Sequence, residues 1–83
     1  KFDTNFNIQL LTIRIMAKVK EITNYKGRYC AELENGEFIL SNGSVELVRC
    51  EKVPQGMKII ESGIIGGIMM RNENDFRWCV ENL

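Results

Sequence analysis

Histidine is absent from this 83-residue sequence, and its absence removes the commonest general base and metal ligand in proteins. The three cysteines, Cys30, Cys50 and Cys79, are an odd number without Cys-x-x-Cys spacing. They therefore predict neither a complete disulfide framework nor a conventional zinc site. A cysteine nucleophile would also lack a histidine partner within the chain. We expect free thiols, no catalytic activity, no metal and no cofactor.

An excess of one charge is absent too, since 11 basic and 11 acidic side chains give a net charge of zero. The apolar clusters are interrupted by Arg14 or by glycines, so none approaches transmembrane length. We find no signal-peptide pattern and expect one small cytoplasmic domain over residues 1–83. Met16, followed by Ala17 and Lys18, resembles a start of translation, so residues 1–15 are interpreted as a non-native or partner-contacting extension.

Two Asn-Gly dipeptides, Asn35-Gly36 and Asn42-Gly43, are the strongest structural signal in the sequence. Asn-Gly favours the type I′ turn, in which both central residues have positive φ, so the pair predicts a three-stranded antiparallel meander. Two-residue loops would place Leu33 opposite Phe38 and Leu40 opposite Val45. One face of this meander would then be apolar, with Tyr29, Ala31, Leu33, Phe38, Leu40, Val45 and Leu47. The other face would collect Cys30, Glu32, Ile39, Ser41, Glu46 and Val48.

Strand and turn signals also flank the meander. Apolar and polar residues alternate over 11–20, which favours a strand, although residues 8–22 also contain a helical spacing. The remaining segments predict strands at 57–61, 64–70 and 76–81, and turns or loops at 23–27, 53–56 and 72–75. The sequence therefore predicts an all-β fold of six or seven short antiparallel strands. We expect them to form a small, partly open barrel of SH3-like or OB-like type.

The glycine-containing segment 64–70 is apolar on both faces if it is a strand, so one face requires a partner in so short a chain. This pattern favours a non-catalytic binding module that acts through protein–protein contacts and associates with itself. The candidate contacts are apolar residues expected at exposed positions of the meander or on the segment itself: Ile39, Val48, Ile65 and Met69.

Basic side chains predominate in residues 1–30, with six against two acidic ones. This asymmetry supports an alternative function, single-stranded nucleic-acid binding by an OB-like barrel. Its candidate residues are Lys18, Lys20, Tyr25, Lys26 and Arg28. The segment 28–38, RYCAELENGEF, resembles the hairpin of translation initiation factor 1-type OB barrels, which carry a similar ELENG sequence. The second Asn-Gly turn and the acidic second half of the chain depart from that family.

Overall fold

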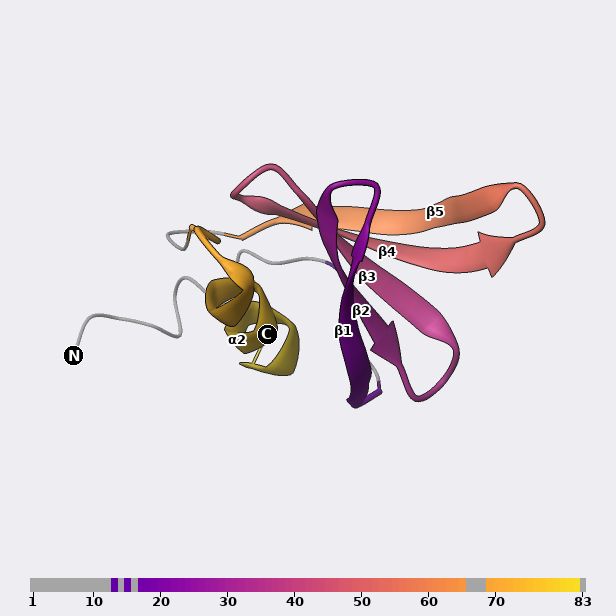
Figure 1. Ribbon diagram of the computed structural model, residues 1–83, viewed down its shortest axis with the longest axis horizontal. Coiled ribbons are helices and arrows are strands. Elements are labelled where there is room, and N and C mark those ends of the chain that lie inside the picture. Colours follow the sequence, from indigo (N-terminus) through magenta and orange to yellow (C-terminus); the bar gives the residue numbers. More distant parts are fainter. Residues whose placement is uncertain (1–12, 14, 16, 66–68, 83) are drawn as a thin grey trace.

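In the part of the chain that the structure describes, a five-stranded antiparallel sheet and a C-terminal helix form the fold (Figure 1). The computed structural model describes residues 13, 15, 17–65 and 69–82. The elements are β1 (Val19–Tyr25), β2 (Arg28–Leu33), β3 (Glu37–Asn42), β4 (Glu46–Val53), β5 (Gly56–Ile64) and α2 (Glu73–Asn82). The strands lie in chain order and do not close into a barrel, so β1 and β5 are the edges of the described sheet. The predicted all-β meander is confirmed, with five described strands.

The first Asn-Gly turn forms, but with a three-residue loop. The Leu33 carbonyl accepts a hydrogen bond from the Gly36 N–H at 3.0 Å. Gly36 has a φ of 90°, whereas Asn35 does not have positive φ. A left-handed glycine at this position is typical of three-residue hairpin loops. Ala31 therefore pairs with Ile39, one residue away from the expected register.

The second Asn-Gly dipeptide also leads into a longer loop than expected. Asn42 is still in β3 and pairs with Glu46, so residues 43–45 make the turn. Leu40 consequently lies opposite Val48, and not opposite Val45 as the two-residue loop would require. The expected registers of both hairpins are wrong because Asn-Gly supplied one left-handed glycine in each loop and not two left-handed residues.

These registers change which apolar residues share a face, because a one-residue shift moves a strand's side chains to the opposite face. We call the two sides the helix face and the open face. The helix face contains Ala31, Leu33, Ile39 and Leu47, which pack with α2. The open face contains Cys30, Leu40, Val48 and Cys50. The sheet thus has two buried apolar faces, and the single apolar face predicted for the meander is wrong.

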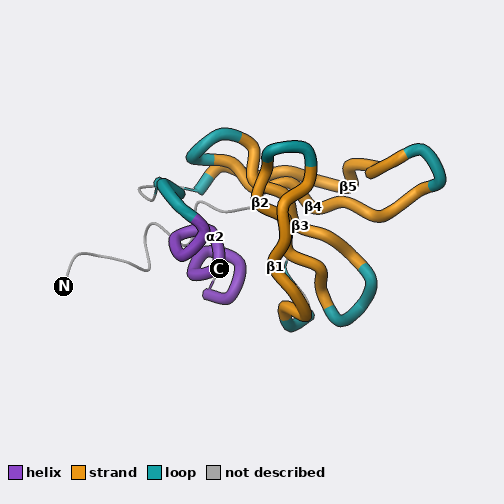
Figure 2. The backbone as a smooth tube through the Cα atoms, viewed as in Figure 1, coloured by secondary structure: helices purple, strands orange, loops and turns teal. Residues whose placement is uncertain are grey.

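The predicted loop at 72–75 and final strand at 76–81 are wrong, because this segment forms α2 (Figure 2). The Asn72 side chain accepts a hydrogen bond from the Asp75 N–H at 2.9 Å, which caps the first turn of the helix. Asp75 in return accepts from the Arg71 N–H at 3.0 Å. This reciprocal arrangement is a close variant of the capping box.

The core of the helix face lies between α2 and the sheet. Phe76, Cys79 and Val80 are buried and follow the i, i+3, i+4 spacing of one helical stripe. The Phe76 ring stacks on Tyr29 of β2, with ring centroids 5.6 Å apart. Ile13 is also part of this core. The helix therefore covers the first two strands and completes one side of the sheet.

The N-terminal strand differs from the strand predicted over 11–20, of which residues 11, 12, 14 and 16 lie outside the described part of the chain. Residues 13, 15 and 17 are not in a strand, and β1 begins at Val19. It continues through most of the predicted turn at 23–27 to Lys26-Gly27, where φ is 51° and 83°. Two positive φ angles in a two-residue loop are the type I′ geometry, formed here without an asparagine.

β5 is longer than its predicted counterpart at 57–61, since it runs through Ser62 and Gly63 to Ile64. Of the predicted strand at 64–70, Ile64 ends β5, whereas residues 65, 69 and 70 are not in a strand. Residues 66–68 lie outside the described part of the chain. The region expected to form two strands therefore contributes one long edge strand.

Candidate functional site

A cavity of about 360 Å³ lies at one end of the open face, between the β1–β2 turn and the start of β5. We call it the open-face cavity. Its volume is within the range typical of small-molecule sites. Its walls are formed by Tyr25, Lys26, Arg28, Leu40, Val48, Cys50, Gln55, Gly56, Met57 and Ile59.

The cavity forms because residues from opposite edges of the sheet meet at this end. Tyr25 is the last residue of β1 and pairs with Arg28 across the tight turn. Gly56 begins β5, and a Cβ atom on it would lie 3.2 Å from the Tyr25 hydroxyl. Gly56 also has a φ of 138°, which favours glycine. Because Gly56 has no side chain, the Tyr25 hydroxyl at the end of β1 can lie close to the start of β5.

Positive charge is concentrated at the rim of the cavity. Lys26 and Arg28 line it, and no carboxylate residue does. The Lys26 Nζ atom lies 5.4 Å from the centroid of the Tyr25 ring, within cation–π distance. Farther along the same face, Glu32 pairs with Phe38 and Glu46 follows the next turn. The basic region is therefore confined to the cavity end.

The three cysteines pack in the protein interior, Cys30 and Cys50 below the open face and Cys79 on the buried side of α2. Cys50 forms part of the cavity floor, and the neighbouring Cys30 is also buried. Burial raises the pKa of both thiols, although a hydrogen bond with Thr23 partly opposes the increase at Cys30. Burial raises the pKa of Cys79, under α2, to about 11. All three thiols are free, and their raised pKa values keep them protonated at neutral pH.

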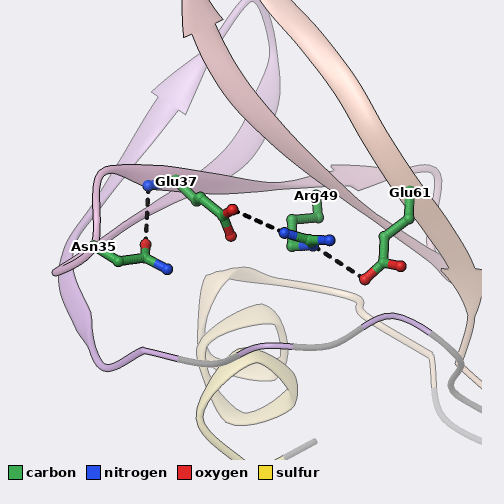
Figure 3. Close-up of polar contacts among 4 residues, drawn as sticks. All are labelled: Asn35, Glu37, Arg49 and Glu61. Carbon is green, nitrogen blue, oxygen red and sulfur yellow. Dashed lines mark hydrogen bonds and ion pairs between the residues drawn. The ribbon is translucent and has the colours of Figure 1, made fainter.

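Arg49 links three strands at the helix face (Figure 3). Its guanidinium donates to Glu37 of β3 at 2.8 Å and to Glu61 of β5 at 3.0 Å. The Glu37 carboxylate is the main reason that the pKa of Arg49 is raised. Glu37 itself is oriented by a hydrogen bond from its N–H to the Asn35 side chain at 3.0 Å. We interpret these contacts as an ion-pair network that fixes the sheet.

The described residues contain no group of three or more side chains arranged to hold a metal ion. The second large cavity, of about 440 Å³, lies between the N-terminal segment and the end of α2. It is lined by Ile15, Ala17, Lys18, Val19, Val80, Glu81 and Asn82. Residues 14, 16 and 83, next to this lining, are outside the described chain, so we base no function on it.

Three of the four predicted protein contacts are buried in the monomer. The exposed fractions are 0% for Ile39, 3% for Val48 and 2% for Ile65, whereas Met69 is 56% exposed. The exposure expected of Ile39 and Val48 is wrong. The register shift turns Ile39 toward the helix core, and neighbouring side chains cover Val48. Contact through these residues would require part of the core to open.

Three exposed isoleucines lie along β5, at positions that were not predicted as contacts. Ile59, Ile60 and Ile64 are 64%, 39% and 54% exposed. Ile59 pairs with Cys50, and a bulge follows it, because the register with β4 shifts by one residue there. The sequence signal for them is the consecutive pair Ile59-Ile60 within a single strand that continues to Ile64.

Three of the five predicted nucleic-acid contacts lie together. Tyr25, Lys26 and Arg28 line the open-face cavity. Lys18 belongs to the other cavity. The Nζ atom of Lys20 lies 3.8 Å from a carboxylate oxygen of Glu32. The structure therefore gathers one aromatic and two basic side chains but separates the remaining two lysines from them.

No similar protein is found. The chain matches no protein-family model and no curated protein, and its structure matches no solved structure. No helix in the described part of the chain is long and apolar enough to span a membrane. A functional assignment must therefore be argued from the described surfaces themselves.

Proposed function

We propose that this chain is a non-catalytic protein-binding module that associates with a second copy through the β5 edge. The observation that carries the proposal is the exposure of Ile59, Ile60 and Ile64 along this one strand. No strand of the described chain pairs with the outer side of β5. An exposed strand edge with apolar side chains is a template for adding another strand.

The other edge has the opposite character. The exposed residues of β1 are all polar or charged: Lys20, Glu21, Thr23 and Asn24. Its pairing with β2 is interrupted by a register shift between Val19 and Glu21. Charges and bulges are the usual protection of an edge strand against unwanted pairing. β5 has a bulge but keeps three exposed isoleucines, so the two edges differ in their suitability for contact.

The β5 sequence is complementary to itself in the antiparallel direction. A pair of β5 strands centred between Ile59 and Ile60 places each Ile59 opposite Ile60 of the second copy. The charged neighbours Lys58 and Glu61 already pair with Glu51 and Arg49 of their own chain, so the contact depends on the isoleucines. β-Branched pairs favour neighbouring antiparallel strands. This complementarity favours a second copy over an unrelated strand.

Light scattering coupled to size-exclusion chromatography tests this proposal over a range of protein concentrations. We expect a dimer that dissociates on dilution. The double substitution Ile59→Lys and Ile60→Lys should weaken the association by about tenfold or more, because it places charges at the apolar centre of the contact. Both positions are exposed, so the melting temperature of the monomer should change little.

A matched control changes two other exposed apolar residues, Val45→Lys and Trp78→Lys, which lie outside β5. These substitutions remove similar apolar surface and add the same charge, but should leave the association constant unchanged. A monomer at every concentration would contradict the proposal. An equal loss of association in both double variants would likewise exclude β5 as the specific contact.

Nucleic-acid binding is the second candidate, supported by the grouping of Tyr25, Lys26 and Arg28. Single-strand binders combine stacking side chains with a basic groove that follows the backbone. Here Glu32 and Glu46 lie farther along the same face, so the positive groove would be short. Binding of an oligonucleotide that weakens steeply with added salt would support this candidate over the first.

A further inference from the structure

We propose that the open-face cavity binds a small amphipathic anion, with its apolar body in the cavity and its anionic head at Lys26 and Arg28. The ligand class is a medium-chain carboxylate. This proposal shares Ile59 with the proposed β5 contact, but Lys26 and Arg28, which would hold the anionic head, lie outside β5.

The floor and walls favour an aliphatic body. Leu40, Val48 and Cys50 form a floor of buried apolar side chains. Met57 and Ile59 add aliphatic surface from β5. A flexible thioether such as that of Met57 adapts readily to the shape of an apolar ligand. Burial of apolar ligand surface against these side chains contributes to the binding free energy.

The rim favours an anionic head. Lys26 lies in the tight turn, Arg28 is the first residue of β2 after it, and both line the cavity. A guanidinium and an ammonium group together match a carboxylate through charge-assisted hydrogen bonds. No acidic side chain lines the cavity, so an incoming carboxylate meets no like charge within it.

The same lining disfavours a nucleotide. A base inserted into the cavity would bring several donors and acceptors, whereas the neutral polar side chains in the lining are only Tyr25 and Gln55. Polar groups buried without partners reduce affinity. A carboxylate on an aliphatic chain places its only polar group at the basic rim. The chemistry of the wall therefore fits an aliphatic chain better than a base.

Two-dimensional amide NMR provides the test, with decanoate as the probe and decanol as the uncharged control. We expect decanoate to shift the amide signals around Tyr25, Arg28 and Gly56, with a dissociation constant of roughly 0.1–1 mM for a ligand of this size. Decanol should bind at least about tenfold more weakly, because it lacks the charged head.

A double variant tests the role of the rim. Lys26→Asn with Arg28→Gln removes both charges, and asparagine tolerates the positive φ of Lys26. We expect decanoate affinity to fall about tenfold, to the level of decanol. The matched control, Lys18→Asn with Lys20→Gln, removes the same charge outside the cavity and should leave affinity unchanged. Association through β5 should persist in both variants, so failure of either proposal is recognised separately.

Several results would overturn the proposal. Decanoate and decanol could bind equally well, or neither could shift the cavity signals at millimolar concentration. Adenosine monophosphate or a short oligonucleotide could shift the same signals more strongly than decanoate. Binding only to vesicles of anionic lipid, with no response to free decanoate, would identify a membrane surface and not a soluble carboxylate as the ligand.

Discussion

The two faces of the sheet are both apolar, but they are covered in different ways. On the helix face, α2 packs over the first strands, and Phe76 is fully buried against Tyr29. On the open face, side chains of the sheet itself provide the cover, mainly Tyr25, Phe38 and Met57. The helix face is therefore a closed core except at the cavity beside the end of α2, whereas the open face has no helix over it and keeps its own cavity and exposed isoleucines.

This difference indicates where the molecule can make contacts. Ile59 and Ile64 pair with Cys50 and Glu46, so their side chains lie on the open face, at its β5 margin. The cavity lies at one end of the same face and is itself lined by Ile59. A second helix packed on the open face would have buried these side chains. We infer that the helix serves folding and that the open face serves binding.

Matched leucine substitutions should separate the two faces, with the largest effect on the helix face. Leu47 is fully buried there, and Leu47→Ala should lower the free energy of unfolding by about 3–5 kcal/mol, because the surrounding closed core cannot collapse into the space. Denaturation by urea measures this loss. A loss below about 2 kcal/mol would show that the helix face is not a closed core.

A leucine-to-alanine substitution on the open face should lower the free energy of unfolding by a smaller amount. Leu40 is buried but borders the open-face cavity, so solvent or the flexible Met57 can occupy the vacated volume. We expect Leu40→Ala to lower the free energy of unfolding by about 2 kcal/mol, near the lower limit for leucine truncation. A cost equal to that of Leu47→Ala would remove the proposed difference between the faces.

The smallest expected effect on stability concerns Asp75, at the start of α2. The Arg71 backbone N–H and side chain donate to Asp75 and hold the pKa of this carboxyl below its ordinary value. A lowered pKa means that this carboxylate stabilises the fold above its unfolded pKa and loses this effect as the pH falls through the folded pKa.

Asp75→Asn should therefore lower the melting temperature slightly at pH 7, and the difference from the natural chain should disappear in acid. Melting curves between pH 2 and 7 provide the measurement. The open-face amide signals should remain unchanged in the variant, because Asp75 acts only at the start of α2. A stability difference that grows toward low pH would contradict this interpretation.

Local signals in the sequence predicted the meander correctly but not its pairing. Asn35-Gly36 and Asn42-Gly43 do lie at the two reversals, yet a positive-φ glycine also suits a three-residue loop. The choice between loop lengths depends on packing. Only the observed register places Ile39 under α2 and Leu40 beside Val48. Because residues 76–81 were predicted to form a strand, the packing of α2 on the sheet could not be used to choose the register.

The sequence also contains signals that favour a helix over residues 73–82. Asn72 and Asp75 have the spacing of a capping box, and Phe76, Cys79 and Val80 have helical spacing. The alternation of Phe76, Trp78 and Val80 imitates a strand, although Trp78 is exposed. The open-face cavity was less accessible to prediction, because it depends on the approach of Tyr25 to Gly56 from opposite edges of the sheet.

Backbone hydrogen exchange at low and high protein concentration tests the central claim most directly, because it compares the two edges within one molecule. If two copies join through β5, amides of β5 between Met57 and Ile60 should become more protected as concentration rises, while those of β1 should not change. Protection that is independent of concentration in β5, or that increases in β1 instead, would contradict the assignment of β5 as the contact edge.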